Sequence, residues 1–429
     1  MTKEKQKQGL STIAVQGGFD SKAHFGSTAV PIYQTAAYQF RDSDHAVALF
    51  NLEESGNIYT RISNPTVSIL EERLALLEGG VGALVTSSGQ SATFLAILNI
   101  AEAGDEIVSS NSLYGGTMTL FTHTLRKLGI TVRFVDQTNL EQWKESLNEK
   151  TKAFFIESIG NPSLNVGDIE AIAQVAHEGG VPLMVDSTFT SPALLRPIEF
   201  GADIIIHSAT KYIGGHGNTI AGVVVDGGKF PWDNGRFPGL SEPDPSYHGF
   251  CYTEAVGEKA YITKLKAQLN RDIGAALSPI SAFLLVQGVE TLPLRMKAHS
   301  ENALGVAKYL ESHPKVAWVR YPGLESHTTY DLAQKYLANG QSGILTFGIK
   351  GGYGAAKAFI DRVQLFKHVA NLGDVRSLVI HPASTTHQQL TDDEKVACGV
   401  TNDLIRVSVG IEDLSDILAD LEQALSTIE

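Results

Sequence analysis

The run HSATKYIGGHG, residues 207–217, directly follows an apolar stretch at residues 202–206. Such a stretch indicates a buried strand, so Lys211 is expected just beyond a strand end. An amine in that position is partly desolvated, which lowers its pKa and makes it a nucleophile toward an aldehyde. The hydroxyls of Ser208 and Thr210 can donate to a phosphate, and the glycines allow a ligand close to the backbone. Pyridoxal 5'-phosphate (PLP) carries both an aldehyde and a phosphate, so the run predicts a PLP site.

A second apolar run, VPLMVDSTF at residues 181–189, places Asp186 at another strand end. PLP stores negative charge only while its ring nitrogen stays protonated, and a buried carboxylate keeps the proton there. Other interpretations exist for each residue alone: Asp186 could form a turn or a helix cap, and Lys211 could extend into solvent. Because the acid and the amine occur together, we favour a cofactor site.

The phosphate of PLP needs hydrogen-bond donors, and GALVTSSGQSATFLAIL at residues 82–98 can supply them. This run predicts a short strand, a turn at Ser87, Ser88 and Gly89, and a helix that begins near Gln90. Free N–H groups and the positive end of the helix dipole bind anions at such a helix start. The motif alone is weak evidence for a phosphate site. It lacks the Walker lysine and the GxGxxG spacing, so ATP and dinucleotides are disfavoured as ligands.

Strands and helices alternate from about residue 65 onward. Strands are expected at 83–87, 106–109, 132–135, 153–157, 183–186, 204–207 and 222–225, and helices at 68–78, 90–101, 116–128 and 169–177. This alternation predicts a mostly parallel sheet covered by helices. Ligands collect beyond the carboxyl ends of parallel strands, which is where Gly89, Asp186 and Lys211 fall.

The remaining parts of the chain have other patterns. Residues 1–60 show little periodicity, which predicts an extended arm, and the Gly/Pro-rich residues 227–249 predict a long surface loop. A second α/β pattern follows, with strands at 344–349 and 404–409 and helices at 353–360 and 417–425. The chain is too long for one ordinary core. We predict an N-terminal arm at 1–64, a large PLP-binding domain at 65–280 and a smaller C-terminal α/β domain at 281–429.

Composition and charge argue against several classes of protein. The net charge of −13 disfavours nucleic acids and anionic membranes as partners. No stretch approaches about 20 uninterrupted apolar residues, and the lysine-containing start has no apolar segment, so neither a membrane span nor a secretory signal is expected. Two distant cysteines, Cys251 and Cys398, suggest a reducing compartment, and we expect the cytoplasm. The histidines lack metal-ligand spacing with these cysteines, so no metal site is expected.

Seven segments together resemble the Cys/Met-metabolism family of PLP-dependent enzymes over essentially the whole chain. They are NIYTRISNPT (57–66), SSGQSA (87–92), NSLYGGT (111–117), ESIGNPS (157–163), VDSTF (185–189), HSATKYIGGHG (207–217) and LIRVSVGIED (404–413). Within the family, the forms FPGLSEPDPSYHG (237–249) and ANLGDVRSLVIHPASTTH (370–387) are most similar to O-acetylhomoserine sulfhydrylases. The resemblance implies a fold-type I PLP-dependent transferase.

The resemblance also implies roles for single residues. Lys211 and Asp186 bind PLP together with Ser88, Gly89, Gln90, Ser208 and Thr210. Tyr114 stacks on the cofactor ring and aids departure of the leaving group, although simple packing is the alternative. Asn161 hydrogen-bonds the ring oxygen and contacts the substrate, unless it only forms a turn.

Arg406 lies in an apolar strand, where an unpaired cation is costly. Either a protein carboxylate or the α-carboxylate of an amino-acid substrate must therefore bind it. A guanidinium group suits bidentate pairing with a carboxylate, and the resemblance implies that Arg406 binds the substrate.

Tyr59 and Arg61 lie in the arm, just before the predicted large domain. The resemblance implies that this pair binds the cofactor phosphate of the neighbouring subunit, with Tyr59 also contacting the substrate, in a dimer that pairs into a homotetramer. From the residues alone, a loop rich in helix-capping residues with a surface arginine is equally consistent with the pattern.

The implied activity is γ-replacement in methionine biosynthesis, in which sulfide or methanethiol replaces the acetate of O-acetyl-L-homoserine to give L-homocysteine or L-methionine. Lys211 would bind the PLP aldehyde and, once released by the substrate, move protons at Cα. Methionine γ-lyase and cystathionine γ-synthase would share every cofactor residue, but lyases typically carry a cysteine where Gly116 stands. A non-catalytic PLP carrier is a distant alternative, which has no use for Arg406.

Overall fold

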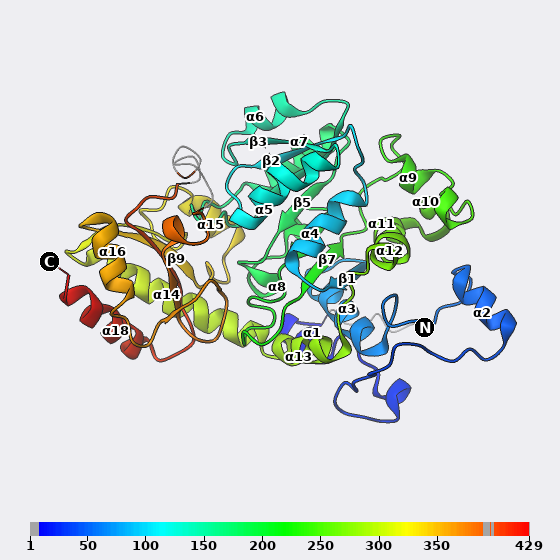
Figure 1. Ribbon diagram of the computed structural model, residues 1–429, viewed down its shortest axis with the longest axis horizontal. Helices are drawn as coiled ribbons and strands as arrows, with labels where there is room; N and C mark the ends of the chain where they lie inside the picture. The colour runs from blue at the N-terminus through cyan, green and yellow to red at the C-terminus, as the bar shows by residue number, and fades with distance from the viewer. Residues whose placement is uncertain (1–7, 389–394, 396–398, 429) are drawn as a thin grey trace.

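A computed structural model describes residues 8–388, 395 and 399–428 and divides most of them between two sheets (Figure 1). The main sheet has seven strands in the order β1-β7-β6-β5-β4-β2-β3. Their bounds are β1 Gly82–Thr86, β2 Glu106–Ser110, β3 Thr131–Val135, β4 Thr151–Glu157, β5 Leu183–Asp186, β6 Ile204–His207 and β7 Gly222–Asp226. Strands β3, β2, β4, β5 and β6 are parallel, and β7 is antiparallel to both of its neighbours. This architecture agrees with the predicted mostly parallel sheet.

Helices cover both faces of the main sheet because successive strand residues point to opposite sides. Val185 packs into one buried cluster and Met184 into the other. The covering helices are α3 Pro65–Glu78, α4 Gly89–Leu98, α5 Gly115–Thr119 with a π-helical continuation Leu120–Leu125, α6 Leu140–Ser146 and α7 Ile169–Glu178. Helix α3 begins three residues before its predicted start, because Asn64 accepts a hydrogen bond from the Thr66 N–H and Pro65 suits a first helical position.

Residues 227–249 are only partly a surface loop, so this prediction was partly wrong. Phe230, Trp232, Phe237 and Leu240 are buried and pack into the same cluster as α4. The segment also contains a short helix, α9 Pro238–Ser241. The glycines and prolines of this segment predicted a loop, whereas its aromatic side chains pack against the core.

Three helical segments lead from the main sheet to the second domain. Helix α11 Ala260–Lys264 continues through a π-helical turn, Leu265–Asn270, into α12 Arg271–Ile273. Helix α13 Pro279–Glu290 then packs against α3 and α1, and α14 Leu292–Ser312 extends to the second sheet. The long helix α14 therefore connects the two halves of the molecule (Figure 1).

The second sheet has five strands in the order β10-β11-β12-β9-β8. Its strands are β8 Val316–Arg320, β9 Ile344–Ile349, β10 Lys367–His368, β11 Leu378–Ile380 and β12 Leu404–Ser408, and its helices are α15 Tyr330–Tyr336, α16 Gly352–Ile360 and α18 Leu414–Ser426. Residues of α14, α16 and α18 share one buried cluster with β9 and β12. The strands and helices predicted beyond residue 340 lie within three residues of these bounds.

The first 60 residues combine a docked helix with an extended arm. Helix α1 Leu10–Gln16 packs against α3, α13 and α14, with Ala14 fully buried, which the weak periodicity did not predict. Beyond it the chain extends away from the main sheet and includes α2 Ser43–Phe50 (Figure 1).

The remaining short elements are α8 Ser191–Leu194, α10 Tyr252–Val256 and 3-10 turns at Ser21–His24, Pro197–Phe200, Pro245–Tyr247, Gly257–Lys259 and Pro382–Ser384. Of the two cysteines, Cys251 is a free thiol and Cys398 lies outside the described residues.

Candidate active site

A cavity of about 290 Å³ lies beyond the carboxyl ends of β4, β5 and β6. Both domains contribute to its wall. The predicted residues that line it are Ser88, Gly89, Gln90, Tyr114, Asn161, Asp186, Ser208, Thr210, Lys211 and Arg406. Of the predicted site residues, only Tyr59 and Arg61 are not among those that line it.

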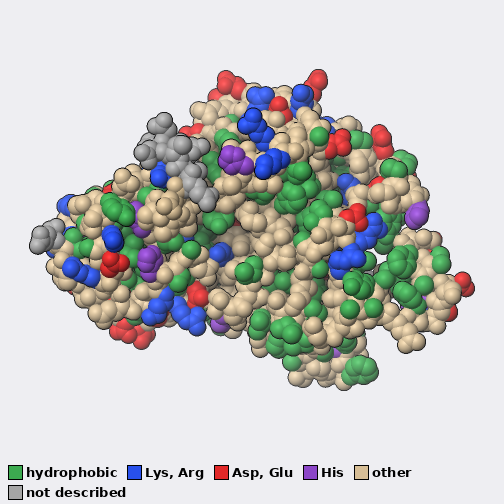
Figure 2. Space-filling view, in the orientation of Figure 1, with side chains coloured by type: hydrophobic (Ala, Val, Ile, Leu, Met, Phe, Trp, Pro, Cys, Tyr) green, Lys and Arg blue, Asp and Glu red, His purple; other side chains and the backbone are tan. Residues whose placement is uncertain are grey.

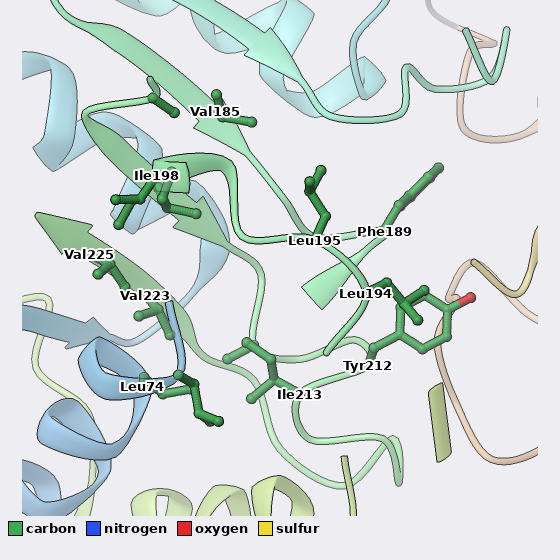
Figure 3. Close-up of a cluster of buried hydrophobic side chains, with 14 of the residues drawn as sticks. Leu74, Val185, Phe189, Leu194, Leu195, Ile198, Tyr212, Ile213, Val223 and Val225 are labelled. Carbon is green, nitrogen blue, oxygen red and sulfur yellow. The ribbon is translucent and has the colours of Figure 1, made fainter. Parts of the chain in front are cut away.

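Lys211 follows β6 in a turn that the protein core holds in place. The next two side chains, Tyr212 and Ile213, point into a buried cluster with Leu194 and Val223 (Figure 3). Beneath the turn, the buried guanidinium group of Arg295 donates to the backbone oxygens of Tyr212 and Ile213, at 2.7 and 3.2 Å. The backbone of the lysine is therefore fixed from two sides.

The amine of Lys211 is poised for reaction with an aldehyde. Burial lowers its pKa to about 8, and the positive charge of Arg406 acts in the same direction. Its Nζ donates a hydrogen bond of 2.6 Å to Oδ1 of Asn371. A substantial fraction of the amine is consequently neutral near physiological pH, and the neutral form is the nucleophile.

Two carboxyl groups lie side by side at the ends of neighbouring strands. Asp186 ends β5 and accepts a hydrogen bond of 2.9 Å from the Thr188 N–H. Burial raises the pKa of Asp186, against the effect of hydrogen bonds from Thr188 and of the nearby His207. Glu157 ends β4 in direct register with Asp186 and also lines the cavity.

The other end of the cavity has the donor groups that a phosphate requires. Ser88 caps α4 by accepting the Ser91 N–H at 3.1 Å, and the first N–H groups of this helix have no carbonyl one turn earlier to bind. Gly89 lies so close to Ser208 that a Cβ on it would be 2.7 Å from the serine Cβ. The helix start and Ser208 can therefore lie side by side in the cavity wall only because residue 89 is glycine.

These groups fit PLP in chemistry and in order. Phosphate donors, a carboxyl group for the ring nitrogen and a partly desolvated amine all line one cavity. No group of three or more His, Cys, Asp or Glu side chains suited to a metal ion occurs in the described part of the chain.

Arg406 extends from β12 into the cavity wall and is 4% exposed. Its Nη1 is 3.4 Å from Oδ1 of Asn161, and its Nη2 is 3.5 Å from the backbone oxygen of Asn371. Burial lowers the pKa of Arg406 to about 10, while Tyr114 and Tyr212 oppose that shift. No ion pair within residues 8–388, 395 and 399–428 involves Arg406, so the protein carboxylate considered from the sequence is not found there.

Tyr59 and Arg61 contact each other outside the cavity. The Arg61 guanidinium carbon is 5.4 Å from the centre of the Tyr59 ring, and the arginine donates to the backbone oxygen of Arg271. Tyr59 is 42% exposed. The single chain therefore does not bring this pair to its own cavity.

The sequence analysis missed three residues of the site. Glu157 ends an apolar strand just as Asp186 does, so the same argument could have identified it. Asn371 and Arg295 have no comparable signal, because each reaches the Lys211 turn from a segment more than 80 residues away in the sequence.

None of the helices within the described residues is both long and apolar enough to cross a membrane. Acidic and basic side chains alternate in small groups on the face shown in Figure 2.

Comparisons with known proteins identify the family of this chain. The model of the family "Cys/Met metabolism PLP-dependent enzyme" matches residues 11–426. An O-acetyl-L-homoserine sulfhydrylase of Leptospira meyeri is 54% identical, with 97% of this chain and 96% of the relative covered. A homocysteine synthase of Schizosaccharomyces pombe is 52% identical, with 98% and 99% covered.

A solved structure from Campylobacter jejuni gives the same result at the level of the fold. It is described as an O-acetylhomoserine (thiol)-lyase, is 42% identical and superposes with a TM-score of 0.94 over 98% of this chain and all of that one. That protein carries a pyridoxyl-lysine phosphate, in which a lysine is bonded to the cofactor. The resemblance inferred from the seven segments, the fold-type I architecture and the predicted cofactor are thus confirmed: this chain belongs to the Cys/Met-metabolism family of PLP-dependent enzymes.

Proposed function

We propose that this enzyme catalyses γ-replacement on O-acetyl-L-homoserine, in which sulfide replaces acetate and L-homocysteine forms. Relatives that are 46–54% identical over nearly their full length carry the names O-acetyl-L-homoserine sulfhydrylase and homocysteine synthase. The observation that carries the proposal is Arg406, a buried guanidinium group without a protein carboxylate, in the same cavity as Lys211. Methanethiol, which would give L-methionine, is the second candidate for the thiol.

Each residue of the cavity has a role in this proposal. Arg406 and Asn161 hold the α-carboxylate of the substrate, which orients Cα toward Lys211. PLP, when bound, supplies an electron sink for the negative charge that develops at Cα. Lys211 removes the Cα proton and returns protons to the substrate, which its lowered pKa favours. Asp186 holds the proton of the cofactor ring nitrogen, and Tyr114 stacks on the ring and assists departure of acetate.

Gly116 weighs against a lyase with a cysteine at this position. A Cβ on Gly116 would lie 2.5 Å from Cε1 of Tyr114, so a side chain there would displace the tyrosine ring. The present position of Tyr114 therefore requires glycine at 116, and a cystathionine γ-synthase remains the closer alternative. A PLP carrier would not need Arg406, because it has no substrate carboxylate to bind.

We also propose that Tyr59 and Arg61 complete the site of a neighbouring subunit by binding its cofactor phosphate, and that Tyr59 contacts the substrate there. The pair lies outside its own cavity, on an arm that exposes the apolar side chains Val47, Phe50 and Leu52. Figure 2 shows hydrophobic side chains in the region of α2, toward the right edge of the molecule. Apolar side chains grouped in this way suit contact with another copy of the chain. We further propose that the enzyme is a homotetramer and that it is located in the cytoplasm.

A competition among substrates tests the proposed activity. The purified enzyme loaded with PLP is assayed with O-acetyl-, O-succinyl- and O-phosphohomoserine against sulfide, methanethiol and cysteine, and kcat/KM is ranked. We expect O-acetylhomoserine with sulfide to rank first. Cysteine as the best thiol would instead identify a cystathionine γ-synthase, and turnover of methionine without any added thiol at a higher kcat/KM would identify a γ-lyase.

A further inference from the structure

Glu157 is a buried acid of the cavity that the proposed chemistry does not use. It is 5% exposed and lines the cavity at the end of β4. Its Oε1 accepts a hydrogen bond of 2.6 Å from the Tyr114 N–H, and its carboxyl group accepts a second from the backbone of Asn161. One side chain thus holds the backbone of the two turns that carry Tyr114 and Asn161.

The same carboxyl group lies next to Asp186. The two residues are direct partners in the register of β4 and β5, whose parallel arrangement turns their side chains to the same face of the sheet. Neighbouring strands are about 4.8 Å apart. Two buried carboxyl groups at paired positions of adjacent strands repel each other when both are charged, which favours a state in which one of them holds a proton.

The surroundings of the two groups assign that proton to Glu157. Burial raises the pKa of Glu157 well above its usual range and the charge of Asp186 raises it further, and these two effects outweigh the hydrogen bonds from the Tyr114 and Asn161 backbones, which lower it. Asp186 is also buried, but hydrogen bonds from Thr188 and the nearby His207 favour its charged form. The positive charge of Arg406 in the same cavity lowers the pKa of Lys211.

We propose that Glu157 is a positioning residue that fixes the Tyr114 and Asn161 turns as an uncharged acid and leaves Asp186 as the charged carboxylate of that edge. A neutral carboxyl group still accepts both N–H groups through its oxygens. It does not compete with Asp186 for the proton of the cofactor ring. The inference rests on PLP binding and not on the identity of the acyl group or the thiol, so it can fail while the proposed reaction stands.

Three variants of the full-length enzyme separate the carboxyl group's contacts from its charge. Glu157→Gln keeps an uncharged side chain of the same shape that can accept both hydrogen bonds, whereas Glu157→Ala removes the acceptor. Glu106→Gln is the matched control: Glu106 is also buried and begins a strand of the same sheet, but it pairs with Arg133 at 2.8 Å and is not among the residues that line the cavity. Circular dichroism and Tm verify the fold of each variant.

Binding of PLP to the apoenzyme is the first measurement. We expect Glu157→Gln to bind with a Kd within about 3-fold of wild type, and Glu157→Ala to bind about 10-fold more weakly because two buried N–H groups lose their acceptor. The absorption band of bound PLP should be unchanged in Glu157→Gln and shifted in Glu157→Ala. Equal losses in both Glu157 variants would overturn the uncharged acid, and a wild-type Kd and band in Glu157→Ala would overturn the positioning role.

Infrared difference spectroscopy of the apoenzyme near pH 7 is the second measurement, and it decides the protonation state even if Glu157→Ala does not fold. The carbonyl stretch of a protonated carboxylic acid should disappear on Glu157→Gln and stay on Glu106→Gln. Loss of a carboxylate band instead would show that Glu157 is charged.

Discussion

The turn that carries Lys211 and the arm that carries Arg61 are built in opposite ways. The turn is surrounded by its own chain: Tyr212 is fully buried in the core, and Arg295 binds the backbone beneath it. The arm leaves the main sheet and exposes apolar side chains, with Phe25 completely exposed and Tyr59 42% exposed.

This difference separates two kinds of functional residue. A side chain placed by its own core has one position whether the chain is alone or assembled. A side chain on an unsupported arm gains its position from whatever surface covers the arm. The chain therefore holds its own amine, acid and guanidinium group in place, while the proposed phosphate contacts of Tyr59 and Arg61 depend on assembly.

The largest expected effect concerns Lys211, whose position depends only on its own chain. Lys211→Ala should lower kcat at least about 10³-fold, because the group that moves the protons is gone. The fold should persist, since Tyr212 and Arg295 still hold the turn. Steady-state kinetics and a thermal melt measure both effects, and a folded variant that keeps a few per cent of wild-type activity would contradict the assignment.

Asp186→Asn is expected to have the next largest effect. Without a charge to hold the proton on the ring nitrogen, kcat should fall at least about 10²-fold, which corresponds to about 3 kcal/mol of barrier. Assays at saturating PLP separate this loss from weaker cofactor binding. A kcat close to wild type would mean that another group, with Glu157 the nearest candidate, holds the proton.

Arg406→Lys keeps the charge but loses the planar fork. KM for O-acetylhomoserine should rise about 10-fold or more, while PLP occupancy, measured by absorbance, stays unchanged. If KM barely moves, the α-carboxylate binds elsewhere.

The lowered pKa of Lys211 predicts a pH dependence for loading of the apoenzyme with PLP. Only the neutral amine attacks the aldehyde, and its fraction rises as pH increases through the pKa of about 8. The association rate should therefore increase about 10-fold from pH 7 to a plateau above pH 9. Stopped-flow fluorescence measures the rate, and a rate that continues to rise toward pH 10.5 would show an ordinary lysine.

The smallest expected effect is a partial recovery of activity, which tests whether Arg61 on the arm serves the neighbouring subunit. Lys211→Ala and Arg61→Ala should each be inactive alone. If Arg61 serves the neighbouring subunit, co-refolding the two variants creates mixed dimers in which one of the two sites has neither lesion. Random assortment makes half of the dimers mixed, so activity should return to roughly a quarter of wild type. Absence of recovery, in samples shown by mass spectrometry to contain mixed dimers, would place Arg61 in its own subunit's site or outside the site.

The sequence predicted the strands well because buried parallel strands are short runs of Val, Ile and Leu that end in polar residues. Lys211, Asp186 and Ser88 were found through those strand ends. Glu157 was missed, although it ends its strand in the same way. The anchoring of residues 227–249 was missed because the aromatics Phe230 and Trp232 stand among residues that usually form loops.

The partners of Arg406 and Lys211 could not be predicted from the sequence. Asn161 and Asn371 approach them across the boundary between the two sheets, and only packing of one domain on the other decides such contacts. The position of Tyr59 could not be predicted from the sequence for a different reason: the arm has almost no core of its own to fix this side chain.

The helix α14 has a consequence for engineering within this family. Arg295 on this helix holds the Lys211 turn, and one turn further His299 contacts both the Tyr212 ring and the backbone oxygen of Val409 in the C-terminal domain. One helix thereby connects the turn that carries the reactive lysine to the second sheet. A chimera that exchanges C-terminal domains between relatives should therefore be joined before the first residue of α14. The HSATKY turn, residues 207–212, should come from the same relative as α14. A junction within the helix would combine the turn of one relative with the contacts of another.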